Sequence, residues 1–350
     1  MGIRVKVDKF NEILKAISKD YKVFAPVVQK GKNTFSETDL IAYKEVKSIE
    51  KIEFNKKAQY SSKEAVMPIT QTLFYFTEEN YTEPKLDSKK VLVFLRSCDI
   101  HAFKRTDEIF LKNGLMDNYY KVLRDKIKFV LMGCEKSFDN CFCVSMGTNT
   151  TEDYQMYVKP SGDEVLMDIK DEELKKIVMA FEDDNLTMDD NFNLEGNLAI
   201  EEVKPEFVKE NSVEVKISQG IDKSLFSHEM WKEYDERCIA CGRCNFACPT
   251  CTCFTMQDIF YKDNKNAGER RRVWASCQIE GYTDMAGGHI FRKANGDRMR
   301  FKVMHKIYDF EKRFGYHMCV GCGRCDDICP QYISLSNCIN KINHVVGELK

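Results

Sequence analysis

The spacing of apolar residues differs between the first and the second part of the chain. Residues 8–21, DKFNEILKAISKDY, carry apolar side chains at helical intervals and predict an amphipathic helix. Short apolar runs predict buried strands, so that the first part is mixed α/β; they lie at 22–27, 91–98 and 128–134. After residue 215 the pattern becomes helical and rich in loops, with helical spacing at 226–234 and 301–314.

An acidic stretch lies between the two parts. Residues 171–210 hold thirteen Asp and Glu against four Lys, and Pro205 stands near the end. A charge run of this kind is usually a solvated face or a connector. We therefore predict two domains, a mixed α/β domain at 1–215 and a mainly helical domain at 216–350.

Net charge and cysteine content narrow the function. A formal charge of −2 gives no reason to expect nucleic-acid binding. The N-terminus, MGIRVKVDKF, lacks the apolar stretch of a signal peptide, and no apolar run approaches the roughly 18 residues that span a bilayer. We therefore expect a cytoplasmic protein, in which thiols stay reduced. Sixteen cysteines in that setting favour metal ligation over a disulfide framework.

Two cysteine runs repeat each other. CIACGRCNFACP at 238–249 and CVGCGRCDDICP at 319–330 both read C-x2-C-x2-C-x3-C-P, which is typical of [4Fe–4S] clusters. The glycines in these runs can take left-handed dihedrals close to a cluster, and the proline fixes the direction in which the chain leaves. Zinc also binds paired C-x2-C elements, but it has no use for a third cysteine and a Cys-Pro in each run.

The repeated runs predict two interleaved clusters. In two-cluster ferredoxins the fourth cysteine of one run ligates the other cluster. The first site then takes Cys238, Cys241, Cys244 and Cys329, and the second takes Cys319, Cys322, Cys325 and Cys248. The predicted fold class is α+β, with a mixed α/β domain followed by a mainly helical, ferredoxin-like domain that carries two [4Fe–4S] motifs.

Four cysteines of the second part remain outside these two sets. For Cys251 and Cys253 two interpretations stay open: both are buried thiols that pack as small apolar side chains, or one replaces Cys248 as a ligand. Cys277 and Cys338 are isolated and are interpreted as packing residues.

A third constellation of cysteines lies in the first domain. Cys98 and Cys134 each end a predicted strand, and Cys141 and Cys143 follow closely in CFC. The carboxyl ends of strands form the crevice where cofactors sit in an open α/β sheet, so these four thiols could hold a third [4Fe–4S] cluster. The alternative is that they only fill space, because their spacing matches no standard run.

The sequence shows no motif for a nucleotide, an attached haem or a substrate. A chain with several one-electron centres and no catalytic residues is best interpreted as a relay whose partners supply the chemistry. The basic region 260–313 could steer an acidic partner or balance the negative charge of the clusters. Arg243 and Arg324, in the two CGRC elements, are candidates for raising cluster potentials.

Several longer motifs resemble one family of iron–sulfur subunits. They are CPTCTCF at 248–254, RSCDIHAF at 96–103, GC-x6-CFC-x-SMGT at 133–148 and MAGGH at 285–289. The family contains the iron–sulfur subunit of the anaerobic sulfite reductase and the beta subunit of sulfhydrogenase. Residues 21–43, with PITQTLFYF and the length, look more similar to the sulfite reductase subunit.

The resemblance implies an electron-transfer subunit without a substrate-reducing site. It would pass electrons from a flavin and NAD(P)H-binding subunit to a sirohaem subunit that reduces sulfite to sulfide. The resemblance also supports the prediction of a third cluster, because all four of its cysteines fall inside family-like motifs. The alternatives are the equivalent subunit of a sulfhydrogenase or nickel–iron hydrogenase, and a free-standing ferredoxin-like carrier.

Overall fold

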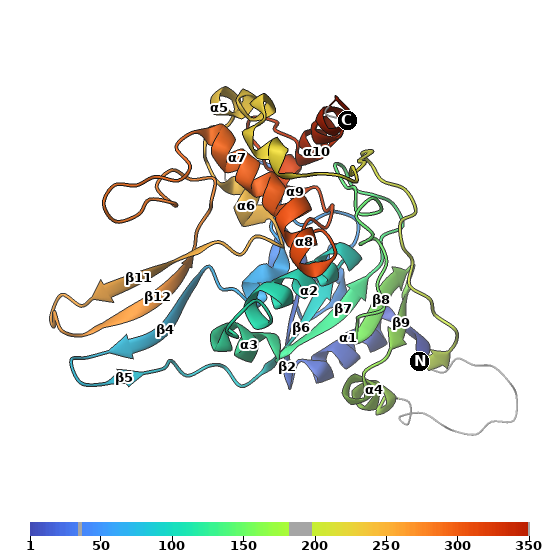
Figure 1. Ribbon diagram of the computed structural model, residues 1–350. Coiled ribbons are helices and arrows are strands. Elements are labelled where there is room, and N and C mark those ends of the chain that lie inside the picture. Colours follow the sequence, from blue (N-terminus) through green and yellow to red (C-terminus); the bar gives the residue numbers. More distant parts are fainter. Residues whose placement is uncertain (34–36, 182–197, 349–350) are drawn as a thin grey trace, which may run out of the picture.

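The computed structural model describes residues 1–33, 37–181 and 198–348, and it combines two sheets with a helical lobe (Figure 1). The predicted acidic connector at 171–210 falls partly outside these residues. In the described part of the chain, no helix is both long enough and apolar enough to cross a bilayer.

The larger sheet forms the centre of the first part. Within the described residues it contains eight strands: β1 (Gly2–Lys6), β2 (Tyr21–Gln29), β3 (Leu40–Glu45), β6 (Lys90–Leu95), β7 (Ile127–Met132), β8 (Met156–Ser161), β9 (Glu164–Ile169) and β10 (Leu198–Ile200). Their order is β10-β1-β9-β8-β7-β6-β2-β3. Strands β2, β6, β7 and β8 run parallel to their neighbours in this series, and the other pairs are antiparallel. The three strands predicted from the apolar runs are thus confirmed.

Helices cover both faces of this sheet. Helices α1 (Val7–Ile17) and α4 (Glu172–Met179) belong to the core on one face, where Leu92 and Phe94 point. Helices α2 (Ser97–Leu111) and α3 (Asn118–Arg124) cover the other face, which receives the alternate residues Val93 and Leu95. Because successive strand residues point to opposite faces, a strand buried on both sides is a continuous apolar run.

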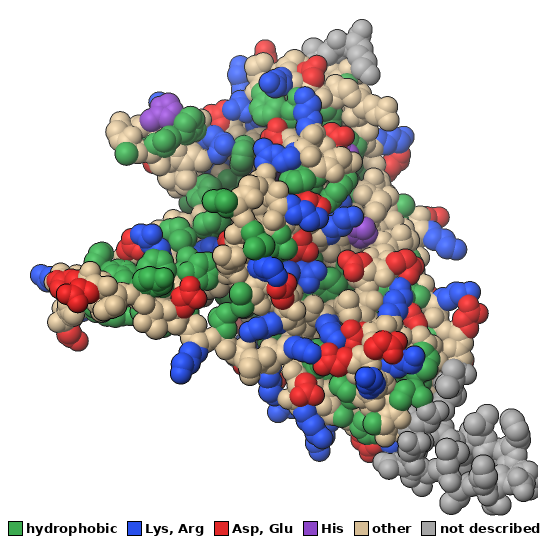
Figure 2. Space-filling view, turned by 60° about the horizontal axis from the view of Figure 1, so that its bottom comes forward, with side chains coloured by type: hydrophobic (Ala, Val, Ile, Leu, Met, Phe, Trp, Pro, Cys, Tyr) green, Lys and Arg blue, Asp and Glu red, His purple; other side chains and the backbone are tan. Residues whose placement is uncertain are grey.

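The smaller sheet extends from the body as an arm (Figure 1). It contains β4 (Thr70–Phe76), β5 (Tyr81–Thr82), β11 (Phe254–Phe260) and β12 (Gly268–Trp274), in the antiparallel order β11-β12-β4-β5. Two of its strands come from each side of residue 215. Apolar side chains gather on the arm's surface (Figure 2), and those of Tyr81 and Phe260 are among the most exposed in the chain.

The arm adds two strands, β11 and β12, to a second part that the sequence predicted to be mainly helical and rich in loops. Strand β11 is exposed along most of its length, so it lacks the apolar alternation by which a half-buried strand is recognised. Contacts between strands hold the arm together instead. The Arg270 guanidinium of β12 binds the Asp258 carboxylate of β11 with two contacts of 2.6 Å, and Arg272 of β12 binds Gln71 of β4 at 2.8 Å.

The helical lobe holds the two cysteine runs. It contains α5 (Glu233–Arg237), α6 (Arg243–Ala247), α7 (Asn295–Met304), a π-helical turn at His305–Asp309, α8 (Phe310–Phe314), α9 (Arg324–Asp327) and α10 (Leu335–Glu348). The helix predicted at 301–314 is confirmed as part of this continuous run. The helix predicted at 226–234 is instead divided between 3-10 turns at Lys223–Ser227 and Glu229–Trp231 and the start of α5 at Glu233. Short 3-10 turns also occur at Ile49–Lys51 and Ser62–Ala65.

Candidate metal centres

The first site is a cavity at the surface of the helical lobe. Its lining includes four thiols, three from the first run and one from the second: Cys238, Cys241, Cys244 and Cys329. The lobe can bring them together because Gly242 has a φ of 74°, which turns the chain between Cys241 and Cys244 into α6. The structure therefore brings together the set that the sequence assigns to one cluster.

The second site lies deeper in the lobe. Cys319, Cys322, Cys325 and Cys248 are each less than 10% exposed. Burial raises the pKa of Cys319 to about 11 and that of Cys322 to about 12, and the charge of Cys248 contributes to both. The same charge contributes to the raised pKa of Cys325. Cys248 thus lies near all three cysteines of the other run.

The crossing of Cys248 and Cys329 gives a direct prediction. We expect Cys248→Ser to alter the cluster held by Cys319, Cys322 and Cys325, and Cys329→Ser to alter the other. Electron paramagnetic resonance of the two variants, prepared anaerobically, measures this. The crossed assignment is wrong if Cys248→Ser damages only the cluster beside it in sequence.

The third site lies between the larger sheet and the helical lobe. One cavity is lined by Cys98, Cys134, Cys141 and Cys143, and Cys322 of the second site also reaches its wall. Strands β6 and β7 are parallel neighbours, and Cys134 follows the end of β7. Cys98 does not end its strand as predicted, because β6 ends at Leu95 and Cys98 lies in the first turn of α2. Burial raises the pKa of Cys143 to about 12. Such thiols become thiolates when a bound metal supplies the compensating charge.

Two glycines let the second cysteine run lie directly on the third site. Gly321 and Gly323 have φ values of 64° and 70°. A Cβ on Gly321 would stand 2.5 Å from the Phe142 carbonyl, and one on Gly323 would stand 2.4 Å from the Asn140 oxygen. The Phe142 N–H also donates to the Gly321 oxygen at 2.8 Å. No larger side chain fits this contact without moving the backbone.

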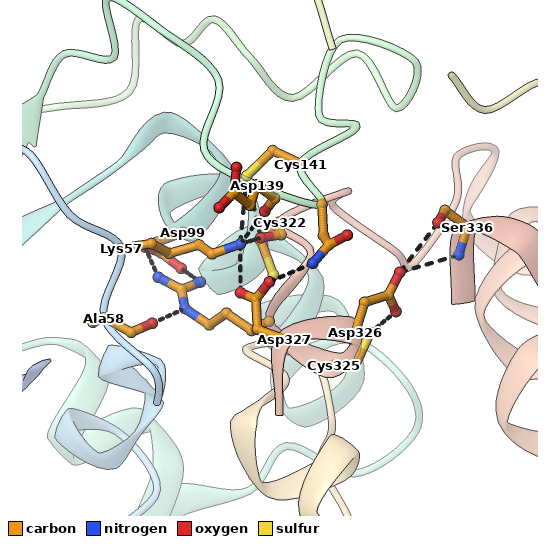
Figure 3. Close-up of polar contacts among 12 residues, drawn as sticks. Lys57, Ala58, Asp99, Asp139, Cys141, Cys322, Cys325, Asp326, Asp327 and Ser336 are labelled. Carbon is orange, nitrogen blue, oxygen red and sulfur yellow. Dashed lines mark hydrogen bonds and ion pairs between the residues drawn. The ribbon is translucent and has the colours of Figure 1, made fainter. Parts of the chain in front are cut away.

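Lys57 joins the same two segments (Figure 3). Its ammonium donates to the Asp139 carbonyl at 2.8 Å and to the Cys322 carbonyl at 3.0 Å, and it pairs with Asp327 at 2.6 Å. The Cys141 sulfur lies 3.7 Å from the same nitrogen. Lys57 and Asp327 therefore form an ion pair between the second and the third site.

A buried ion pair fixes the other side of this interface (Figure 3). Arg324 binds both carboxylate oxygens of Asp99, at 2.6 and 2.8 Å, and donates to the Ala58 carbonyl at 2.9 Å. The two charged side chains are 2% and 1% exposed. The charge of Arg324, predicted to raise a cluster potential, is thus balanced by Asp99. Near the same cavity, Arg96 donates to the Gly133 carbonyl at 2.6 Å.

Two buried lysines, which sequence reasoning did not single out, stand beside the first and second sites. Lys306 lies 3.4 Å from the Cys248 sulfur and donates to the Thr250 hydroxyl at 2.9 Å. Burial by itself lowers the pKa of Lys302. The negative charges of Cys244 and Cys325 more than offset this effect, so the pKa of Lys302 is raised. The two lysines stand four residues apart, on one face of the same helical run, and that spacing is a signal visible in the sequence.

Removing the charge of Lys306 is expected to lower the midpoint potential of the second cluster. A positive charge favours the reduced, more negative state, so Lys306→Met should shift the potential downward by on the order of 60 mV, a tenfold change for a one-electron couple. A redox titration followed by electron paramagnetic resonance measures the shift. Lys312→Met, on the exposed side of the lobe, is the control, and an equal shift in both variants would contradict the local effect.

The donor sets fit iron–sulfur clusters better than single ions. Among the residues that the structure describes, no three Cys, His, Asp or Glu side chains lie close enough to hold one metal ion. Zinc needs such a convergence of ligands, whereas a cubane binds each thiolate through a different iron. Two sets of four thiols that each line one cavity, and a third set buried together in the lobe, suit the cubane.

The remaining cysteines divide into two groups. Cys338 is fully buried in the core of the helical lobe, which agrees with the predicted packing role. Cys251, Cys253 and Cys277 instead line a further cavity together. No sequence signal marks Cys277, because its neighbours in space come from a different segment.

Comparisons with known proteins agree with the cysteine geometry. Residues 237–333 match the model of the 4Fe-4S dicluster domain family. The second part of the chain therefore contains a 4Fe-4S dicluster domain. The chain is 29% identical to sulfhydrogenase 2 subunit beta of Pyrococcus furiosus over 336 residues, which is 95% of each chain. No solved structure matches the chain.

Proposed function

We propose that the chain is the electron-transfer subunit of a multi-subunit oxidoreductase, with three [4Fe–4S] clusters in series. The observation that carries this proposal is that neighbouring sites share residues. Lys302 lines the first cavity, and its pKa is raised by the thiolates of Cys244 and Cys325, one from each of the first two sites. Cys322, assigned to the second site, lines the third cavity.

The residues of the chain would hold and tune the clusters, which when bound supply one-electron transfer. Four cysteines hold each cluster, with the crossed assignment in the first two sites. Lys302 and Lys306 supply positive charge beside the first and second sites, so these two clusters are reduced at a higher potential than thiolates alone would allow. Burial of its four cysteines excludes water from the second site.

For the partners we propose a flavin subunit that oxidises NAD(P)H and a sirohaem subunit that reduces sulfite, in the cytoplasm. Residues 21–43 and PITQTLFYF at 68–76 support this version, whereas CPTCTCF and GC-x6-CFC-x-SMGT fit either kind of subunit. A second version, the beta subunit of a sulfhydrogenase or hydrogenase complex, is supported by the relative from Pyrococcus furiosus and its coverage of nearly the whole chain. Both versions assign the same relay to this chain.

Purification of the native complex under anaerobic conditions tests both versions. Sirohaem in the complex supports the sulfite reductase, and nickel supports the hydrogenase. The chain itself is expected to carry iron and acid-labile sulfide in equal amounts and no zinc. Zinc as its only metal would overturn the relay, and a stable monomer that reduces many acceptors would favour a free-standing carrier.

A further inference from the structure

Cys253 and Cys277 bring two sulfur atoms into direct contact outside the three proposed cluster sites. Cys253 precedes β11, Cys277 follows β12, and the Ala275 N–H donates to the Cys253 carbonyl at 3.0 Å. The two cysteines therefore close the open end of the β11–β12 hairpin. The Cys277 thiol donates a hydrogen bond to the Cys253 sulfur.

The two sulfurs have different surroundings. The Cys253 sulfur accepts from the thiol and the backbone N–H of Cys277 and from the Tyr282 hydroxyl, which together lower the pKa of Cys253 to about 6. The hydrogen bond to Cys253, with burial, raises the pKa of Cys277, and the Asn245 amide donates to its sulfur at 3.0 Å. At neutral pH the pair is one thiolate and one thiol. A nucleophilic thiolate beside a resolving thiol is the arrangement of redox-active cysteines.

The pair faces a cavity that can admit a small molecule. Its volume is about 220 Å³, and its lining includes Cys253, Cys277, Arg292, His305 and Lys306. The volume is several times that of a water molecule. Lys306 and Arg292 make the cavity cationic, and no Asp or Glu of the described residues lines it. An anionic guest is therefore favoured over a cationic one.

We propose that Cys253 and Cys277 form a redox-active dithiol that exchanges with small anionic disulfides in this cavity. The Cys253 thiolate attacks one sulfur of the guest, the guest S–S bond breaks, and one half leaves as a thiolate. The Cys277 sulfur then attacks the mixed disulfide at Cys253, and its proton leaves with the second half, which departs as a thiol. The protein pair is oxidised to a disulfide, and the guest is reduced by the same two electrons.

The third thiol at the cavity does not replace either partner. Cys251 is hydrogen-bonded to Cys248, which the second cluster site uses, so its sulfur is engaged on that side. The exchange needs only the chain's own cysteines, and it is independent of the electron relay. A small dithiol reductant restores the pair by the reverse steps.

The test uses the full chain, isolated anaerobically with its iron, and two disulfides of similar size and opposite charge. Dithiodipropionate is expected to react at least tenfold faster than cystamine and to remove two hydrogens, with peptide mapping placing the new bond between Cys253 and Cys277. The rate should fall as pH drops below about 6, because the Cys253 thiolate is then protonated. In the Cys277→Ser variant a stable mixed disulfide should remain on Cys253, and Cys253→Ser should form neither product.

Cys338→Ser, in the core of the lobe, is the matched control and should react as the unmodified chain does. Iron content is measured in every variant, so that a misfolded protein is recognised. A bond through Cys251, or a pair that reacts only after iron is removed, would overturn the dithiol. Equal rates with cystamine would overturn the preference for anions.

Discussion

Replacing Cys141 and Cys143 together by serine is expected to remove about one third of the iron, about four of about twelve atoms per chain. Both thiols line the third cavity, and the loop that carries them faces the Gly321 and Gly323 backbone. Iron and sulfide analysis of the anaerobically prepared full chain measures the loss. Electron paramagnetic resonance should still show the two ferredoxin-type clusters, because their ligands are untouched.

Cys338→Ser is the matched control, since it also removes a buried thiol but belongs to none of the three proposed cluster sites. It should leave the iron content unchanged. Full iron content in the Cys141→Ser, Cys143→Ser double variant would show that these thiols hold no cluster. The first part of the chain would then need another explanation for its four converging cysteines.

The second large effect is expected from Asp99→Asn. This change leaves the Arg324 guanidinium buried without its counter-charge, and such a loss typically costs about 3–5 kcal/mol. The midpoint of anaerobic urea unfolding should therefore fall strongly. Asp258→Asn breaks the exposed pair with Arg270, and it should produce no measurable change.

A variant with both charges removed separates the two contributions to this effect. Asp99→Leu combined with Arg324→Met replaces the pair by apolar side chains, and much of the lost stability should return. If the double variant is as unstable as Asp99→Asn, the charge imbalance is not the cause. The contact of Arg324 with the Ala58 carbonyl would then carry the stability.

The sequence predicts those parts of the fold that depend on local patterns. The stretches 91–95 and 129–132 are continuously apolar because β6 and β7 are covered on both faces. Such runs can be recognised from the sequence alone. Because the two strands are parallel neighbours, Cys98 and Cys134 both lie beyond their carboxyl ends. The motif spacing likewise groups the ferredoxin-type cysteines, because each run carries three ligands of one cluster within seven residues.

The rest depends on contacts between distant segments. Strand β12 pairs with β4 from the first part of the chain, about 200 residues earlier, and its three arginines read as a solvated charge run. Lys57 is an ordinary lysine in sequence, and only the fold places it between Asp327 and Cys141. Cys277 resembles an isolated packing residue until the hairpin brings Cys253 beside it. No local pattern records such pairings.

The contact of Gly321 with Phe142 also sets an order for events during synthesis of the chain. The ribosome releases the larger sheet and the Cys141–Cys143 loop long before residues 319–324 exist. Between residue 215 and residue 324, synthesis at typical rates takes roughly 5–20 s. During that interval the second cysteine run does not yet cover the loop, so the site of the proposed third cluster is open on that side. Once the glycines close over the loop, the cavity is sealed from one side by backbone.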